Sequence, residues 1–338
     1  MMPLVSIISP CYNGENYVSR FLDSVLSQTY DNIELIVIND GSKDKTLQVL
    51  EAYRSKFQDR GYSYTIINQE NAGQSAAINQ GLKIFKGEYM SWIDSDDAMT
   101  PDAIQKKVAY MEKNPNVGLA LCKIWVVEFG SYSIIGDQKR TPPTEKDEFF
   151  YDFISGTNVF YTPGGFFVRS LMFRDAMPKP LQIECPREIG QNFQLILPIA
   201  FKYPIGYIDD YLFYYSVRLD SHSHENHSFE KQNKIYDIAE HVLICIANKL
   251  QYSDDTERNR VRRAIQVRTL NSKLRCLFDY KRTDGLDEII VGLKKNAAYK
   301  IVQRKIALII KYPALRYFIR IIHLPKRIAM KLICLIVG

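Results

Sequence analysis

The sequence has few cysteines, no paired metal-ligand spacing and no long uncharged apolar run. Its six cysteines are scattered over 338 residues without a C-x-x-C pair, which argues against a zinc site or a disulfide framework and for free thiols in a reducing compartment. Residues 1–20 lack the basic-then-apolar order of a signal peptide, so we expect a cytoplasmic protein. The absence of about 18 consecutive uncharged apolar residues disfavours a membrane-spanning helix.

Two familiar nucleotide-binding signatures are missing as well. The chain has no G-x-G-x-x-G motif and no Walker-type lysine, which disfavours dinucleotide-binding and P-loop folds. The turn after the first predicted strand lacks the Gly, Lys and Arg enrichment that is typical of nucleotidyltransferases. A nucleotide site in this chain therefore has to be built from other residues.

Acidic residues are absent from the last fifty positions. The net charge is +6, yet the last acidic residue is Glu288, and eleven Lys or Arg follow it. Without those eleven, 33 basic residues face 38 acidic ones, so the body of the chain has a net charge of −5. A nucleic-acid enzyme would spread its basic residues over the body, so no nucleic-acid partner is predicted. A basic tail interleaved with Ile and Leu indicates an anionic membrane surface as a partner.

Strand and helix patterns alternate four times in the first 95 or so residues. Short apolar runs predict strands at residues 4–9, 33–38, 64–67 and 88–93. Helical spacing or small-residue composition predicts helices at residues 15–28, 43–57 and 75–85. This alternation predicts an α/β fold with an open parallel sheet and crossover helices.

Polar side chains follow all four predicted strands, at the edge where ligands bind in such sheets. The strand ends carry Pro10-Cys11-Tyr12-Asn13, Asn39-Asp40-Gly41-Ser42, Asn68-Gln69-Glu70-Asn71 and Asp94-Ser95-Asp96-Asp97. A tyrosine that can stack on a base, an aspartate that can accept from a base N–H and an acidic strand end together describe a nucleotide diphosphate site. For any single loop, plain solvation is the alternative, because loops are polar in general.

Three carboxylates lie within four residues at the last of these strand ends. Asp94, Asp96 and Asp97 directly follow an apolar run, so they repel one another unless a cation lies among them. Oxygen ligands at i and i+2 on a strand end suit Mg²⁺ or Mn²⁺ carrying a diphosphate. The alternative is a solvated loop or a helix N-cap before Thr100-Pro101.

Residues 3–97 resemble the nucleotide-binding half of the inverting family 2 glycosyltransferases of the GT-A fold, of the kind that assembles bacterial surface polysaccharides. The resemblance rests on three segments: VSIISPCYNGENYVSRFLDSVLSQTYDNIELIVINDGSKDKT, NAGQSAAINQG and GEYMSWIDSDD. It implies a Rossmann-like GT-A domain with a mostly parallel central sheet, followed here by a C-terminal helical appendage.

The resemblance also implies roles for individual residues. Pro10 and Tyr12 would flank the nucleobase, and Asp40 would hydrogen-bond it. Asp94 would hold the ribose or donor sugar as a catalytic residue, and Asp96 would ligate Mn²⁺ or Mg²⁺. The other expected nucleotide-sugar contacts are Asn13, Asn71, Gly73, Ser95 and Arg218. Family members usually have Arg where this chain has Ile78, so one cation expected near the nucleotide is missing.

The catalytic base is where the chain departs most from the family. The family's Glu-Asp pair at the start of a helix would fall on Gln191-Asn192, and an amide does not accept a proton at neutral pH. Glu188, roughly one helical turn before Asn192, is the predicted base, and Glu184 is the alternative. Glu188 could instead stabilise the helix N-terminus. Without a base the chain would be a catalytically silent sugar-nucleotide-binding or scaffold subunit.

Two later stretches carry further candidates. His222, or else His224, is predicted to reach the metal or the diphosphate, with a solvated polar loop as the alternative. The aromatic runs at 149–153 and 161–167 are predicted to wall an acceptor sugar site, with plain hydrophobic core as the alternative.

The sequence thus predicts two regions. Residues 1–228 would form the transferase domain, with 1–97 as its nucleotide-binding half and 98–228 as its acceptor and catalytic half. Residues 229–338 would be helical and basic. Pro313 and Pro325 divide the end of this region into amphipathic pieces that would lie in the plane of a membrane, with packing on the body as the alternative.

The function predicted from the sequence is metal-dependent transfer of a sugar from a nucleotide-sugar donor, UDP-linked, to a glycan or lipid-linked oligosaccharide acceptor. The expected location is the cytoplasm, peripheral at the inner face of the cell membrane. Such a protein would serve bacterial capsule, O-antigen or exopolysaccharide synthesis.

Overall fold

The computed structural model describes residues 2–141, 148–184, 186, 189–218 and 227–312. The chain forms two compact units. The first consists of residues 1–226 with 241–258, and the second of residues 227–240 with the chain from Asn259 onward. Helices α9 (Phe229–Lys249) and α10 (Asp255–Tyr280) therefore contribute residues to both units. The domain boundary expected at residue 228 stays a prediction.

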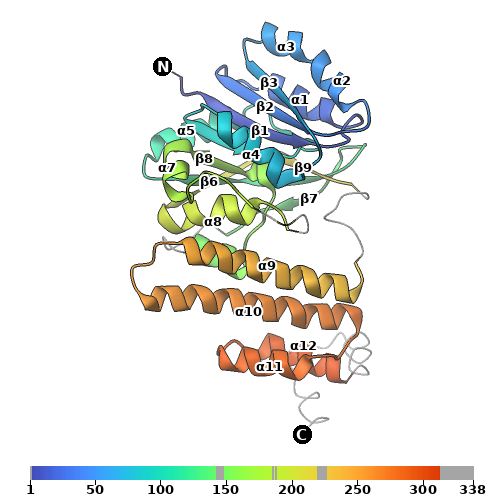
Figure 1. Ribbon diagram of the computed structural model, residues 1–338, viewed down its shortest axis with the longest axis vertical. Coiled ribbons are helices and arrows are strands. Elements are labelled where there is room, and N and C mark those ends of the chain that lie inside the picture. The colour runs from blue at the N-terminus through green and yellow to red at the C-terminus, as the bar shows by residue number, and fades with distance from the viewer. Residues whose placement is uncertain (1, 142–147, 185, 187–188, 219–226, 313–338) are drawn as a thin grey trace. The chain divides into compact units, whose positions relative to one another are not determined.

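The N-terminal part of the sheet is parallel (Figure 1). Its strands are β1 (Val5–Cys11), β2 (Ile33–Asp40), β3 (Ser63–Gln69) and β4 (Tyr89–Trp92). They lie in the order β3-β2-β1-β4. The connecting helices are α1 (Val18–Leu26), α2 (Thr46–Ala52), α3 (Arg54–Asp59) and α4 (Gln74–Ile84). Strands β1 and β2 are buried along their whole length, as mainly apolar strands covered on both faces should be, and the buried Glu34 of β2 accepts from Ser6 Oγ of β1.

The second part of the sheet is mixed. Beyond β4 it continues through β8 (Phe166–Arg169), β6 (Leu119–Glu128), β9 (Ile205–Val217) and β5 (Ala98–Met99), and β7 (Ile134–Gln138) pairs with β6. Strands β6 and β9 are parallel, whereas β8, β7 and β5 are antiparallel to their neighbours. The helices of this part are α5 (Ala103–Lys113), α6 (Glu148–Ser155), the 3₁₀ turn η1 (Pro163–Gly165), α7 (Ser170–Ala176) and α8 (Asn192–Lys202). The predicted α/β fold with C-terminal helices is confirmed, but the sheet is mixed where a mostly parallel one was expected, because β8, β7 and β5 join it in antiparallel orientation.

The turn η1 fits tightly against β9. A Cβ atom on Gly164 would lie 1.9 Å from Phe213 Cε2, so this position accepts no side chain without displacing the ring. On the other side Lys107 of α5, which is fully buried, donates from Nζ to Gly164 O at 2.8 Å. A buried ammonium group needs such a partner, so the contact fixes the loop that enters β8.

Several local predictions differ from the structure. The side chains of Phe149, Phe150, Phe153, Phe166 and Phe167 are between 0% and 3% exposed, so they form hydrophobic core rather than the wall of an acceptor site. The single helix expected over residues 43–57 is divided into α2 and α3.

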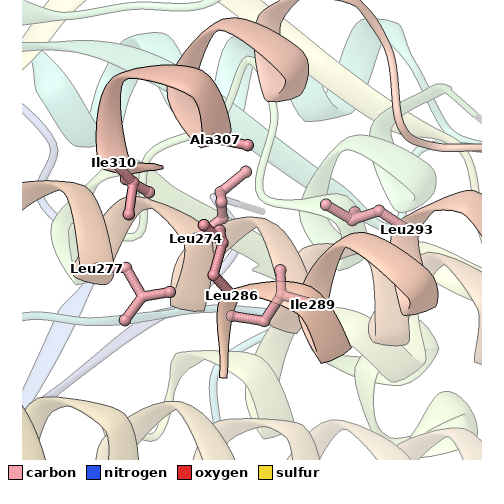
Figure 2. Packing of buried hydrophobic residues seen from close by; sticks show 7 residues of the cluster. All are labelled: Leu274, Leu277, Leu286, Ile289, Leu293, Ala307 and Ile310. Atoms are coloured by element: carbon pink, nitrogen blue, oxygen red, sulfur yellow. The ribbon is translucent and has the colours of Figure 1, made fainter. Parts of the chain in front are cut away.

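The second unit is helical. Helices α11 (Leu286–Lys295) and α12 (Ile301–Lys311) share an apolar core with α10, shown in Figure 2. The core consists of Leu274, Leu277, Leu286, Ile289, Leu293, Ala307 and Ile310. Among the helices that the structure describes, none is long and apolar enough to cross a membrane. Residues 313–338, which carry the end of the basic tail, lie outside the described residues.

Candidate functional site

Hydrogen bonds join the loops at the carboxyl edge of the parallel strands. Asp40 lies opposite Gln69, so the loops after β2 and β3 leave the sheet side by side. The backbone N–H of Asn13, in the loop after β1, donates to Ser42 Oγ at 2.9 Å, and Lys43 N–H donates to Asn13 Oδ1 at 2.9 Å. The side chain of Asn13 therefore ties the first loop to the second.

Asp40 organises the next junction. Its carboxylate is 4% exposed and accepts from the backbone N–H groups of Ala72 and Gly73, each at 2.9 Å. The amide of Asn71 donates to Asp40 O at 3.0 Å. Gly41 has φ +71°, and a Cβ there would lie 2.5 Å from Asn71 N, so glycine permits this close approach. The predicted site residues Asp40, Asn71 and Gly73 are thus in direct contact, while their nucleotide roles stay predictions.

Tyr12 presents an aromatic ring beside these loops. Its side chain is 41% exposed, and Tyr17 Oη donates to Tyr12 O at 2.9 Å, which fixes the backbone of the turn. An exposed ring in an anchored turn is suited to stacking on a nucleobase. Pro10, the other predicted flank of the base, is buried within β1. Both contacts with a base stay predictions.

The carboxylates of the acidic strand end face different partners. Asp94 Oδ1 accepts from Gln74 Nε2 at 2.6 Å, which connects the loop after β3 to the end of β4. Asp97 is 1% exposed, and its Oδ1 accepts from Ser216 N at 2.8 Å. Asp96 Oδ2 forms an ion pair with Arg218 Nε at 3.2 Å. Contacts from α4 and from the end of β9 therefore hold the three carboxylates.

The acidic strand end carries unfavourable negative charge. Burial, and then the charge of Asp96, raise the pKa of Asp94 to about 7. Burial, and then the charges of Asp96 and Asp94, also raise the pKa of Asp97. Ser95, between them, is 5% exposed. A cation placed among these groups would stabilise their charged forms.

Two arginines lie near this strand end, Arg20 on α1 and Arg218 just after β9. The guanidinium of Arg218 lies 4.3 Å from the centroid of the Tyr17 ring while it pairs with Asp96. Arg20 of α1 donates from Nη1 to Ser216 Oγ at 2.7 Å and lies over the Tyr132 ring at 3.9 Å. Burial lowers the pKa of Arg20, while nearby acidic groups, among them Asp97, act to raise it. Aromatic faces thus hold both guanidinium groups beside the carboxylates.

Arg20 was missed in the sequence. It occupies a polar position of an amphipathic helix, and its partner Ser216 lies 196 residues further along the chain. Nothing in the local pattern distinguishes it from a solvated arginine. Arg218 was predicted, as a contact of the diphosphate, and the structure places it on the predicted metal ligand.

The donor set suits a divalent cation that a ligand helps to bind. Within the described residues, no group of three or more His, Cys, Asp or Glu could hold a metal ion by itself. Asp96 offers carboxylate oxygen, the ligand type that Mg²⁺ and Mn²⁺ prefer, and the raised pKa of Asp94 marks charge that a cation would compensate. Phosphate oxygens of a nucleotide would have to complete such a site. His222, the second predicted ligand, lies outside the described residues, as does His224.

The start of α8 holds no carboxylate. Gln191 is 2% exposed, and Asn192 accepts from Trp92 Nε1 at 2.8 Å and donates to Tyr161 O at 2.6 Å. Both ends of the Asn192 amide are therefore occupied, and neither residue can act as a base. Glu188, the predicted base, lies outside the described residues.

The structure also shows the surroundings of Glu184 and Ile78, which the sequence singled out. Glu184, the alternative base, is exposed, and its backbone N–H donates to Gln194 Oε1 at 2.6 Å. Ile78, where the family usually has arginine, is fully buried in the core. The next residue, Asn79, makes two hydrogen bonds to the backbone of Ile183.

Comparison with known proteins matches the N-terminal half of the chain. The model of the family Glycosyl transferase family 2 matches residues 6–175. An uncharacterized glycosyltransferase of Haemophilus influenzae is 38% identical over 161 residues, which cover 48% of this chain and 49% of that protein. One of Rickettsia typhi is 43% identical over 133 residues, which cover 39% of this chain and 40% of that protein. The matched segment thus spans at most about half the length of these relatives.

Solved structures of low sequence identity share the fold. S. aureus TarS 1–349 in complex with UDP-GlcNAc superposes with a TM-score of 0.61 at 18% identity, over 82% of this chain and 80% of that chain. The mannosyltransferase PcManGT of Pyrobaculum calidifontis, in complex with GDP-Man and Mn²⁺, gives a TM-score of 0.54 at 15% identity, over 92% and 85%. The predicted GT-A-like fold is confirmed by this likeness.

Proposed function

The chain belongs to glycosyl transferase family 2, and we propose that it transfers a sugar from a nucleoside-diphosphate donor to a glycan acceptor. The observation that carries this proposal is the continuous hydrogen-bonded edge formed by Asn13, Asp40, Gly73 and Asp94 at the ends of the parallel strands. Such an edge is where open α/β sheets bind nucleotides. A structural relative has been solved with UDP-GlcNAc, and we propose a UDP-linked donor here, with a GDP-linked one as the alternative.

The acidic strand end would hold the diphosphate part of the donor. We propose that Asp96 binds Mn²⁺ or Mg²⁺ together with the donor's phosphate oxygens, and that Asp94 orients the ribose or the transferred sugar. The metal, when bound, would neutralise the negative charge that develops on the leaving diphosphate. Arg20 and Arg218, each stacked on a tyrosine, would supply further positive charge on the same side.

The transfer requires a carboxylate that removes the acceptor's proton. The acceptor hydroxyl attacks the anomeric carbon, the bond from that carbon to the diphosphate breaks, and inversion follows from attack on the opposite face. Glu188 is retained as the proposed base, with Glu184 as the alternative. Gln191 and Asn192 are excluded because amides are not bases at neutral pH.

The acceptor is proposed to be a lipid-linked glycan. Support comes from the acid-free end of the chain, whose described part carries Lys294, Lys295, Lys300, Arg304, Lys305 and Lys311. Basic helices of this kind bind anionic membrane surfaces, where lipid-linked acceptors reside. A role in bacterial capsule, O-antigen or exopolysaccharide synthesis would follow.

Nucleotide binding tests the donor site. Isothermal titration with UDP, GDP, UDP-GlcNAc and GDP-mannose in the presence of Mn²⁺ should show binding of one nucleotide family. Asp40→Asn should weaken that binding roughly 10- to 100-fold, because Ala72 N–H and Gly73 N–H bind different oxygens of the carboxylate and an NH₂ group in place of one of them cannot accept. Asp31→Asn, on an exposed carboxylate of the same half, is the matched control and should bind like the wild type. Absence of binding by the wild type would refute the donor site.

A second candidate function is a silent sugar-nucleotide-binding subunit. It is favoured by one observation, namely that the amide of Asn192 is engaged in structural hydrogen bonds at the helix start where the family places its carboxylates. Release of UDP or GDP from the bound sugar nucleotide separates the two candidates. Nucleotide binding without release, with water or any glycan as acceptor, would favour the silent subunit.

A further inference from the structure

The side chain of Asn192 joins three segments of the first unit. Its Oδ1 accepts from the indole Nε1 of Trp92 at 2.8 Å, and its Nδ2 donates to Tyr161 O at 2.6 Å. Trp92 ends β4, Tyr161 precedes the turn η1, and Asn192 begins α8. One amide therefore connects the strand that leads to Asp94 with the helix and loop on the far side of β8.

This position requires a side chain that both accepts and donates a hydrogen bond. The indole N–H is a donor without acceptor capacity, and a backbone carbonyl is an acceptor without a proton, so the group between them must do both. A carboxylate at residue 192 would leave the carbonyl of Tyr161 without its donor. An aliphatic side chain would remove both hydrogen bonds, and Trp92 is only 1% exposed, so water cannot readily replace the bond to its indole.

Trp92 transmits this constraint to the donor site. It is two residues before Asp94, and its ring stacks on Phe166 of β8 with centroids 5.9 Å apart. Asp94 is in turn held by Gln74 at 2.6 Å. The direction in which the chain leaves β4 thus depends on a ring that is fixed by stacking on one side and by Asn192 at its N–H.

We propose that Asn192 is a positioning residue for the acidic strand end, acting through the indole of Trp92. This inference rests on the proposed function, because the group that Asn192 would position is Asp94, the proposed donor-binding carboxylate. Asn192 exchanges no proton in this role. The helix start that carries a carboxylate in the family serves here to orient the donor edge.

Two other amide side chains also act as both donor and acceptor. Asn79 of α4 donates to Ile183 O at 2.7 Å and accepts from Ile183 N at 2.9 Å. Gln194, on the same helix as Asn192, holds the backbone of Glu184 through both ends of its amide. Three amides are therefore each used as donor and acceptor: Asn192 between Trp92 and Tyr161, Asn79 on Ile183 and Gln194 on Glu184. The repeated use of amides supports a structural and positioning role for this helix start.

The indole N–H resonances report the proposed hydrogen bond directly. The chain has two tryptophans, so an ¹H–¹⁵N spectrum shows two indole signals, and Trp125→Phe assigns the signal of Trp92. Asn192→Leu should move the Trp92 signal toward the position of an indole without a hydrogen bond. Asn114→Leu, which also removes an amide donor from a backbone carbonyl, is the matched control and should leave it unchanged. An unmoved Trp92 signal in Asn192→Leu would overturn the proposal.

A double-mutant cycle tests whether the bond positions the donor site. Affinities for UDP and for GDP, each with Mn²⁺, are measured for Asn192→Leu, Trp92→Phe and the double variant. Each single change should weaken binding roughly five- to tenfold, and the double variant should be no weaker, because both remove the same bond. Additive losses, or affinities within twofold of wild type, would show that Asn192 is merely structural.

A conservative variant separates the two ends of the amide. Asn192→Asp keeps an acceptor for Trp92 but no donor for Tyr161, so it should retain the Trp92 signal and nucleotide affinity while lowering the melting temperature. If Asn192→Leu does not fold, the nucleotide affinity of Asn192→Asp decides between the two roles. A loss of affinity in Asn192→Asp equal to that in Trp92→Phe would refute positioning through the indole. If the wild type binds neither nucleotide, the donor site itself fails and the proposed role falls with it, while the Trp92 signal still shows whether the hydrogen bond exists.

Discussion

The ion pair between Arg218 and Asp96 predicts competition between the protein's own cation and a metal. The Nε–Oδ2 distance is 3.2 Å, and the two side chains are 16% and 20% exposed. If Asp96 is a metal ligand, a divalent ion must displace Arg218 from it. Removing the arginine should therefore strengthen metal binding in the absence of nucleotide.

The size of the effect follows from the geometry. At 3.2 Å and an effective dielectric constant of about 20, the attraction is about 5 kcal/mol before the cost of desolvation. Desolvation offsets most of it in a partly buried pair, which leaves on the order of 1–2 kcal/mol. Since 1.4 kcal/mol corresponds to a factor of about ten, Arg218→Gln should bind Mn²⁺ roughly 5- to 30-fold more tightly than the wild type.

Electron paramagnetic resonance of free Mn²⁺ measures this affinity without any nucleotide or turnover. Arg54→Gln removes the same charge from an exposed pair on α3 and controls for net charge. The same Arg218 variant should bind UDP with Mn²⁺ more weakly, because the displaced guanidinium no longer faces the diphosphate. Unchanged or weaker Mn²⁺ binding by Arg218→Gln would refute the displacement and, with it, Asp96 as the site of exchange.

Two further predictions concern stability and membrane binding. Burial lowers the pKa of Lys107, so folding disfavours its protonated form. The wild-type free energy of unfolding should therefore rise with pH up to the pKa of lysine in the unfolded chain, about 10.4. Lys107→Met should lack this increase. Urea unfolding of both proteins between about pH 7.5 and about pH 9.5 checks this, and a difference that stays constant with pH would contradict it. The basic C-terminal helices should make the protein sediment with phosphatidylglycerol vesicles at about 50 mM salt and release it at about 500 mM, since screening shortens the electrostatic range. Phosphatidylcholine vesicles are the control, and equal binding to both kinds would exclude an electrostatic anchor.

The parallel half of the fold was predictable because its signals are local. Strands β1 and β2 are mainly apolar and buried along their length, and each ends in the polar residues that form the candidate site. Parallel strands bring their carboxyl ends to one edge, so the proximity of Asn13, Asp40 and Asp94 could be inferred from chain order alone. The mixed second half was harder, because antiparallel pairings such as β4 with β8 join segments about eighty residues apart.

The aromatic runs show why composition could not place the acceptor site. A ring that walls a sugar site and a ring that fills the core have the same identity, and only burial distinguishes them. Phe153 and Phe166 are fully buried and pack on each other, whereas the ring of Tyr161 is half-buried. Their burial depends on α6 and β8 meeting, which no periodicity of residues 149–167 reveals.

The candidate site also depends on the last strand of the sheet more than its motifs suggest. The end of β9 supplies Ser216, whose backbone N–H holds Asp97 and whose hydroxyl holds Arg20, and then Arg218, which pairs with Asp96. Two charged neighbours of the acidic strand end are thus Arg20 of α1 and Arg218, and Arg218 lies about 120 residues after the motif. The acidic strand end therefore depends on the residue that follows β9 for the positive charge of Arg218. If Asp96 is the metal ligand that we propose, a shift of Arg218 on ligand binding would act on it directly through this ion pair.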